Sequence, residues 1–122
     1  MKFEQDNAAG RNSFTGYGEG YVEVNRKRYA ASLVVSADRI VTDWPARSIE
    51  GLTADHFAAV VALAPEIVLL GTGTRFAFPA PALLAPLRQA GIGVEVMDTP
   101  AACRTYNILL GEGRNVVAAL VV

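Results

Sequence analysis

At 122 residues, the chain has the length of a single folded domain and can bury a core without metal ions or disulfides. Its formal net charge of −1 argues against binding to nucleic acid and against bulk electrostatic attraction to an anionic membrane. Cys103 is the one cysteine of the sequence, which excludes an internal disulfide and a structural zinc site built from cysteines.

Residues 1–16 are polar and without periodicity, and we expect them to form a short strand or an irregular N-terminal arm. Residues 1–6 are too polar for a signal peptide. The longest apolar runs are far shorter than the roughly 20 residues of a membrane-spanning helix. We therefore predict one α/β domain over residues 1–122, in the cytoplasm, with no transmembrane segment and with any membrane association peripheral.

Residues 17–42 predict a β-meander, because short apolar segments alternate with polar turns. The expected elements are a strand over 21–24, a turn over 25–27, a strand over 28–36, a turn over 37–38 and a strand over 39–42. Trp44 follows, next to Pro45. We expect this tryptophan to cover one end of the core, with an anchor in a protein interface as the alternative.

A helix is predicted to begin after Thr53, which suits the N-cap position, and to stop at Pro65. Apolar residues at helical spacing mark its buried face, which comprises Phe57, Val60, Val61 and Ala64. His56, the one histidine, lies off this face. The sequence offers it no partners for a metal site, so we expect no metal.

The second half of the chain predicts strand, helix, strand, helix, strand. Residues 67–70 are all apolar, which is typical of a strand buried on both faces of a parallel sheet. Residues 93–97 and 116–122 are the other two strands of this βαβαβ pattern. Because βαβ units cross over right-handed, the first two of these strands should run parallel.

The two helices of this half carry proline near their starts. The first is predicted to open at Pro79 or Pro81, and Pro86 then requires either a later start near Ala82 or a bend. Its expected apolar face comprises Leu83, Leu84, Leu87 and Ala90. The second helix is predicted to have Thr99 as its N-cap and Pro100 in the first helical position, and to end at Gly111.

The C-terminal ends of parallel strands open on one edge of a sheet, where α/β proteins usually bind ligands. This edge should bring the turn Gly71–Arg75 beside the segment Asp98–Arg104, with two helix N-termini pointing at it. Such an edge suits a carboxylate, a phosphate or an acidic side chain of a partner. The candidate site comprises Gly71, Thr72, Gly73, Arg75, Asp98, Thr99, Cys103 and Arg104.

No catalytic or nucleotide motif supports this site. The turn Gly71–Gly73 lacks the third glycine of a dinucleotide fingerprint, and no Gly-Lys-Ser/Thr of a P-loop occurs. Cys103 has either a lowered thiol pKa near a helix start or a buried position, and burial is favoured. Glu95, in an apolar strand, is expected to pair with Arg104 or Arg114. We expect no catalytic residues and no cofactor.

An ordered set of short strings resembles a known family. The strings include Leu69-Leu70-Gly71-Thr72-Gly73, Phe78-Pro79, Gly91-Ile92-Gly93-Val94-Glu95-Val96-Met97, Ala102-Cys103-Arg104-Thr105-Tyr106-Asn107 and Glu112-Gly113-Arg114. Together they resemble a family of small domain-of-unknown-function proteins that includes the mitochondrial NADH:ubiquinone oxidoreductase (complex I) assembly factor 3. The resemblance implies a compact three-layer α/β domain with a central mixed β-sheet. It also implies that mitochondrial members act through protein partners at the inner membrane.

Two functions remain open from the sequence. The first is a non-catalytic protein-binding or assembly-factor-like module, in a cytoplasmic, prokaryotic member of the family, with a protein partner such as a subunit of a membrane complex. The second is a binder of a small anion or metabolite, or an enzyme, that uses the edge at Gly71–Arg75 and Asp98–Arg104. The sequence does not indicate an oligomeric state.

Overall fold

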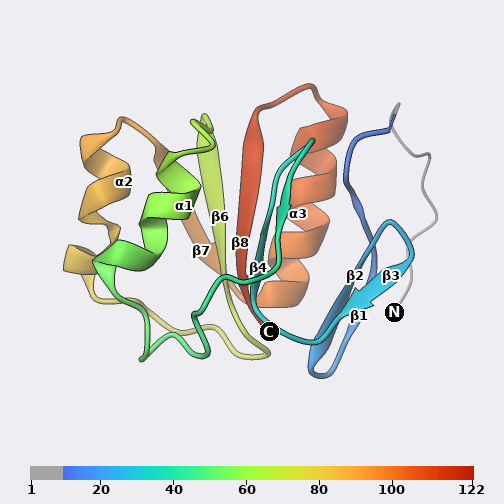
Figure 1. Ribbon diagram of the computed structural model, residues 1–122, viewed down its shortest axis with the longest axis horizontal. Coiled ribbons are helices and arrows are strands. Elements are labelled where there is room, and N and C mark those ends of the chain that lie inside the picture. The colour runs from blue at the N-terminus through green and yellow to red at the C-terminus, as the bar shows by residue number, and fades with distance from the viewer. Residues whose placement is uncertain (1–9) are drawn as a thin grey trace.

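The computed structural model describes residues 10–122, which fold into three layers (Figure 1). The middle layer is a five-stranded mixed sheet with the strand order β5-β4-β8-β6-β7. Its strands are β4 (Leu33–Val35), β5 (Ile40–Val41), β6 (Ile67–Thr72), β7 (Gly93–Met97) and β8 (Val116–Val121). The predicted three-layer α/β fold with a central mixed sheet is confirmed.

The parallel part of the sheet comes from the second half of the chain. β6 lies between two parallel neighbours, β7 and β8. β4 pairs antiparallel with β8, and β5 pairs antiparallel with β4. The helices α2 (Ala85–Gln89) and α3 (Thr99–Gly111) lie in the two connections between the parallel strands. The predicted βαβαβ order and the parallel pairing of its first two strands are confirmed.

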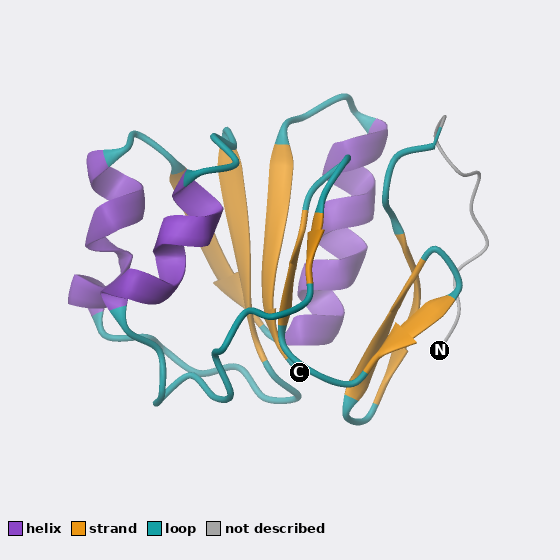
Figure 2. Ribbon diagram, viewed as in Figure 1, coloured by secondary structure: helices purple, strands orange, loops and turns teal. Residues whose placement is uncertain are grey.

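Each face of the central sheet carries its own apolar core. One face is covered by α3 and by a second, three-stranded antiparallel sheet of β1 (Phe14–Gly18), β2 (Tyr21–Val24) and β3 (Lys27–Tyr29). The other face is covered by the 3₁₀ turns η1 (Ala54–Phe57) and η2 (Pro81–Leu84) and by α1 (Ala58–Val61) and α2 (Figure 2). Along β8, Val117 and Ala119 enter this core, while Ala118 and Leu120 enter the core under α3.

The predicted meander is divided between two sheets, which corrects the sequence analysis. The strand expected over 28–36 is two strands, because the exposed residues Ala30 and Ala31 carry the chain from β3 to β4. The turn between β2 and β3 is shorter than predicted and consists of Asn25 and Arg26, with φ of 51° and 69°. Two-residue hairpin loops favour positive φ at both positions, so Lys27 is free to pair with Val24. β1 begins at Phe14, within the last residues of the expected arm.

The helices of the other face are shorter than their apolar patterns predict. Ala64 and Ala90, each assigned to a buried helix face, are exposed. Ala64 has a φ of 49° and lies beyond the end of α1, where its carbonyl oxygen accepts a hydrogen bond from Asn115. Pro86 is accommodated because α2 starts at Ala85 after η2, which places this proline in the first helical turn, where no N–H is needed.

Glu95 does not form the predicted ion pair. β7 is an edge strand, and the Glu95 side chain is exposed on it. Arg114 instead forms a salt bridge with Glu66, with 2.8 Å between the guanidinium nitrogen and the carboxylate oxygen. An exposed carboxylate keeps its hydration, so Glu95 needs no partner inside the fold.

Candidate functional site

The turn after β6 and the start of α3 lie side by side at one edge of the central sheet. The backbone N–H of Thr99 donates to the carbonyl of Gly73 over 2.8 Å. The N–H of Gly73 donates in return to the Thr99 hydroxyl over 2.9 Å. The expected meeting of the two segments at the C-terminal ends of parallel strands is therefore what the structure shows.

Thr99 and Gly71 hold this edge together. The buried Thr99 hydroxyl donates to the carbonyl of Val121 over 2.6 Å, so it joins the ends of β6 and β8 to α3. A Cβ on Gly71 would lie 2.8 Å from the Thr99 hydroxyl and 2.7 Å from a methyl carbon of Leu120. Both residues of the predicted site thus serve close packing, which only glycine permits at position 71.

The first turn of α3 has no free N–H group for an anion. Asp98, and not Thr99 as predicted, is the N-cap, because its carboxylate accepts from the N–H of Ala101 over 2.8 Å. The N–H of Ala102 donates to the carbonyl of Asp98, and Pro100 has no N–H. The second helix start expected here is also absent from the edge, since residues 74–80 separate β6 from η2.

The predicted thiol and arginine point to other parts of the fold. Cys103 is fully buried, and its desolvation raises the pKa of the thiol from 9.0 to about 12. The favoured burial of this cysteine is confirmed. Arg104 donates to the Tyr17 hydroxyl over 2.6 Å, and its guanidinium lies 5.7 Å from the centre of that ring. Arg75 is exposed, and its carbonyl accepts a hydrogen bond from Thr72.

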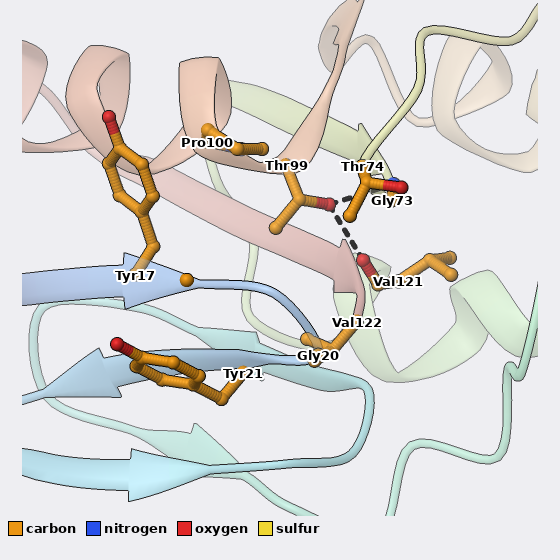
Figure 3. Close-up of a pocket in the computed structure, with 10 residues that line it drawn as sticks. Tyr17, Gly20, Tyr21, Gly73, Thr74, Thr99, Pro100, Val121 and Val122 are labelled. Carbon is orange, nitrogen blue, oxygen red and sulfur yellow. Dashed lines mark hydrogen bonds between the residues drawn. The ribbon is translucent and has the colours of Figure 1, made fainter. Parts of the chain in front are cut away.

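A small cleft lies beside this edge, where the β1–β2 hairpin faces the start of α3 (Figure 3). Gly73 and Thr99 are the two residues of the predicted site that line it. The complete lining is Tyr17, Gly18, Gly20, Tyr21, Gly73, Thr74, Thr99, Pro100, Val121 and Val122. None of these side chains is charged, and the Thr99 hydroxyl is used by its bonds to Gly73 and Val121 (Figure 3).

The two tyrosines are the part of the cleft that the sequence analysis missed. The Tyr17 side chain points from β1 toward α3, and Tyr21 lies on the neighbouring strand of the hairpin (Figure 3). The Tyr21 ring makes a cation–π contact with Arg28, whose guanidinium lies 4.0 Å from the ring centre. A Cβ at Gly18 would lie 2.4 Å from the Tyr21 ring, so glycine at position 18 leaves room for it. The two glycines between Tyr17 and Tyr21 were the available signal for a tight turn that brings the tyrosines together.

A second, more open depression lies beside Trp44. Trp44 itself is only 4% exposed, and its indole N–H donates to the carbonyl of His56 over 2.8 Å. The predicted position at one end of the core is confirmed, since Trp44 packs with Phe57. The His56 ring accepts from the N–H of Thr53, which gives it a structural role at the start of η1.

Within residues 10–122, no three His, Cys, Asp or Glu side chains come close enough together to hold a metal ion. In the same part of the chain, no helix has the length and apolar character needed to cross a bilayer.

Comparison with known proteins adds a family and several relatives. The family model described as a protein of unknown function (DUF498/DUF598) matches residues 14–121. NADH dehydrogenase (ubiquinone) 1 alpha subcomplex assembly factor 3 from Bos taurus is 45% identical over 83 residues, which are 66% of this chain. The matched segment spans only 45% of the length of that relative.

Two bacterial proteins are similar over most of their length. A 13 kDa major membrane protein from Francisella tularensis is 30% identical over 109 residues, which cover 88% of this chain and 89% of that protein. A crystal structure of a protein from Bordetella parapertussis superimposes with a TM-score of 0.86 at 43% identity, covering 93% of this chain and 98% of that one. The fold described above is thus shared with an experimentally determined structure.

Proposed function

The chain belongs to the family described as a protein of unknown function (DUF498/DUF598), and from that membership we propose that it is a non-catalytic binding module that helps a partner protein to assemble. The similarity to assembly factor 3 supports this proposal. Because the matched segment is less than half of that relative, the assembly role is carried over as a hypothesis about this domain.

The observation that carries the proposal is the uncharged, tyrosine-lined cleft between the β1–β2 hairpin and α3. Its cavity volume, for a water-sized sphere, is about 20 Å³, far below the roughly 300–1,000 Å³ of typical small-molecule sites. The cleft therefore has room for the tip of one side chain of a partner. Aromatic rings also line the grooves in which several domains bind extended peptides.

The groups on which catalysis could rest are engaged elsewhere. The Cys103 thiol is buried and has a raised pKa, so it is a poor nucleophile at neutral pH. The Asp98 carboxylate caps α3. These two engagements favour a binding role over an enzymatic one.

The alternative function, a small-anion site at the same edge, has less support. Anion sites at helix starts depend on free backbone N–H groups, and the N–H groups of Thr99, Ala101 and Ala102 are all used within the protein. Neither Arg75 nor Arg104 lines the cleft. We therefore expect inorganic phosphate and nucleotides to leave the melting temperature unchanged in a thermal-shift assay.

We further propose that the partner is a subunit of a membrane complex and that the chain meets it at the membrane surface from the cytoplasm. The names of two relatives support this setting, one an assembly factor of NADH dehydrogenase and the other a major membrane protein. The proposal concerns where the chain acts and does not depend on a membrane-spanning element in it.

The cleft can be tested by filling it. Thr74 is exposed at its rim, so Thr74→Trp should block the cleft without disturbing the core, while Thr74→Ser should leave it open. With the chain as bait in detergent-solubilised extract of its source, Thr74→Trp should reduce capture of a specific partner at least about tenfold. Tyr21→Ala should act in the same direction, and Tyr29→Ala, from the same small sheet but outside the cleft, should not.

A cross-linking measurement places the partner in the cleft. In Thr74→Cys the new thiol is exposed, whereas Cys103 is buried, so a maleimide-linked photocrosslinker reacts at position 74. We expect the cross-link to join the same partner that the capture experiment retains. Equal capture by Thr74→Trp and the unaltered chain, with no cross-link from position 74, would rule out the cleft as the binding site.

A further inference from the structure

A loop with two exposed phenylalanines lies between β6 and η2, and we call residues 75–80 the aromatic loop. Phe76 is 48% exposed and Phe78 is 85% exposed. Their rings pack edge to face, with 4.6 Å between centroids and an interplanar angle of 84°. Exposed apolar side chains are common singly, but two contacting rings on one loop form a patch that soluble proteins usually reserve for binding.

The protein holds this loop in a defined shape. The Thr72 hydroxyl donates to the carbonyl of Arg75 over 2.6 Å and accepts from the N–H of Ala77 over 3.2 Å. Ala77 packs against the core under α1 and α2, so the ring on either side of it is turned outward. These contacts fix the first half of the loop before any partner binds, which lowers the entropic cost of binding.

The composition of the loop suits hydrocarbon more than a protein surface. Residues 76–80 contain no polar side chain, and Pro79 has no N–H to leave unsatisfied. Protein interfaces usually surround an aromatic anchor with polar groups, and residues 76–80 offer none.

The charge around the loop favours an anionic surface. The whole chain has a net charge of −1, but residues 67–94 contain no aspartate or glutamate and carry Arg75 and Arg88. Arg75 is exposed immediately before Phe76. A basic side chain next to exposed aromatic rings is the pattern of interfacial membrane anchors.

We propose that the aromatic loop docks the protein on an anionic lipid bilayer, with Phe76 and Phe78 in the interfacial region and Arg75 at the phosphate groups. The docking is peripheral and reversible, since two aromatic rings bury far less apolar surface than a spanning helix. This surface is separate from the tyrosine-lined cleft, because neither phenylalanine lines the cleft.

Co-sedimentation with lipid vesicles tests the proposal directly. The unaltered chain should pellet with vesicles of phosphatidylcholine and phosphatidylglycerol, and less with vesicles of phosphatidylcholine alone. The double variant Phe76→Ser/Phe78→Ser should bind the anionic vesicles at least about tenfold more weakly, given the usual transfer free energy of a phenylalanine side chain. Both positions are exposed, so the melting temperature of this variant should stay close to that of the unaltered chain.

Matched substitutions elsewhere show whether vesicle binding depends on this loop or on any exposed apolar or basic side chain. Ile108 is 61% exposed near the other end of α3, so Ile108→Ser removes an exposed apolar side chain away from the loop and should not change vesicle binding. Arg75→Gln should weaken binding to anionic vesicles several-fold. Arg39→Gln, in the turn between β4 and β5 at the opposite edge of the sheet, should not.

A tryptophan reporter shows whether the loop enters the bilayer. In Phe78→Trp the new indole should be quenched by phospholipids brominated on their acyl chains, whereas the buried Trp44 of the unaltered chain should not. The proposal is overturned if the unaltered chain stays in the supernatant with both vesicle types, or if the double phenylalanine variant pellets as well as the unaltered chain. Loss of protein capture in that variant, without vesicle binding by the unaltered chain, would identify a protein-docking loop instead.

The two tests fail separately. Tyr21→Ala alters the cleft from β2 and leaves the aromatic loop unchanged, so it should bind vesicles nearly as the unaltered chain does. Capture lost in Tyr21→Ala with vesicle binding retained assigns the two surfaces to two partners. Vesicle binding without any captured protein overturns the proposed function and leaves the lipid-docking loop standing.

Discussion

Thr99 connects three elements through one side chain. Its hydroxyl accepts from the N–H of Gly73 at the end of β6 and donates to the carbonyl of Val121 at the end of β8, while the residue itself begins α3. Thr99 is buried, with 5% of its surface exposed. Its hydroxyl therefore pairs with one backbone donor and one backbone acceptor where the three elements meet.

Replacing Thr99 by valine should destabilise the protein through these two groups. Thr99→Val keeps the shape but leaves the Gly73 N–H and the Val121 carbonyl without their partner, and an orphaned buried group costs about 1–3 kcal/mol. We expect the free energy of unfolding from urea titration to fall by about 2–4 kcal/mol. Thr99→Ser retains the hydroxyl and should recover most of the loss, and equal losses in both variants would contradict this account.

Cys103 should make stability depend on pH in the alkaline range. In the unfolded chain the thiol ionises near pH 9, whereas in the folded protein burial raises its pKa to about 12. The stabilising contribution is therefore fully present below about pH 9 and is lost as the pH rises toward 12. Over this window the free energy of unfolding should fall more steeply, by about 1.4 kcal/mol per pH unit, than in Cys103→Ala.

The comparison with Cys103→Ala cancels the contributions of the other groups that titrate at alkaline pH. Burial also raises the pKa of Tyr106, which contributes a slope of the same sign to both proteins. Only the difference between the two slopes reports on the thiol. Parallel slopes from pH 9 upward would show that the thiol ionises equally easily in both states.

The wrong N-cap predicted for α3 shows what the local sequence leaves undetermined about single residues. Asp98 and Thr99 are both good N-cap residues, and the pattern of the helix fits either start. The choice is made by distant contacts, because Gly73 and Val121 draw the Thr99 hydroxyl away from the helix end. Those partners are brought close only by the assembled sheet. The same applies to Tyr17 and Tyr21, which meet the start of α3 across the fold.

At the scale of elements, the long apolar strands and the long helix were predicted well. β6, β7, β8 and α3 lie close to their predicted bounds because their apolar patterns are long and their turns contain glycine or proline. The predictions for α1 and α2 were too long, since an apolar pattern cannot show that Ala64 adopts a left-handed conformation. The division of the meander between two sheets was not predictable from strand patterns alone, because β3 and β4 have the same local character in either arrangement.

β7 is the edge of the central sheet where Glu95 has a protective role. One side of β7 pairs with β6, and within residues 10–122 no strand pairs with its other side. Glu95 stands in the middle of an apolar strand, with Val94 and Val96 on either side. Two copies of β7 paired antiparallel around this residue would place two carboxylates opposite each other, which is destabilising. Charged residues on edge strands commonly prevent association in this way.

Removing this charge in favour of an apolar side chain should promote association. Glu95→Val is expected to elute earlier than the unaltered chain in size-exclusion chromatography and to scatter more light as concentration rises. Glu50→Val, an equal change at an exposed loop position, should not. Glu95→Gln should alter the free energy of unfolding by less than about 0.5 kcal/mol, because the side chain is exposed. Identical elution of Glu95→Val and the unaltered chain would exclude the protective role.

At the scale of the whole molecule, the central strands link the two cores. β6 places Val68 and Leu70 in the core under α1 and α2, and Leu69 in the core under α3. β8 divides its side chains in the same way. Neither face can lose its packing without exposing strands that the other face also needs. A chain of this size with shared central strands should unfold as one cooperative unit.

Two native probes can test this cooperativity from opposite faces of the sheet. Trp44 lies in the core with α1 and α2, and Cys103 lies in the core under α3. In a urea titration, the change in Trp44 fluorescence and the exposure of the Cys103 thiol to a short labelling pulse should have the same midpoint.

Val60→Ala weakens the first core and Val22→Ala the second, each by about 2 kcal/mol. Each substitution should lower both midpoints equally, because β6 and β8 transmit the loss of either core. A thiol that becomes exposed at lower urea than Trp44, or a substitution that moves one probe alone, would show that the two faces unfold independently.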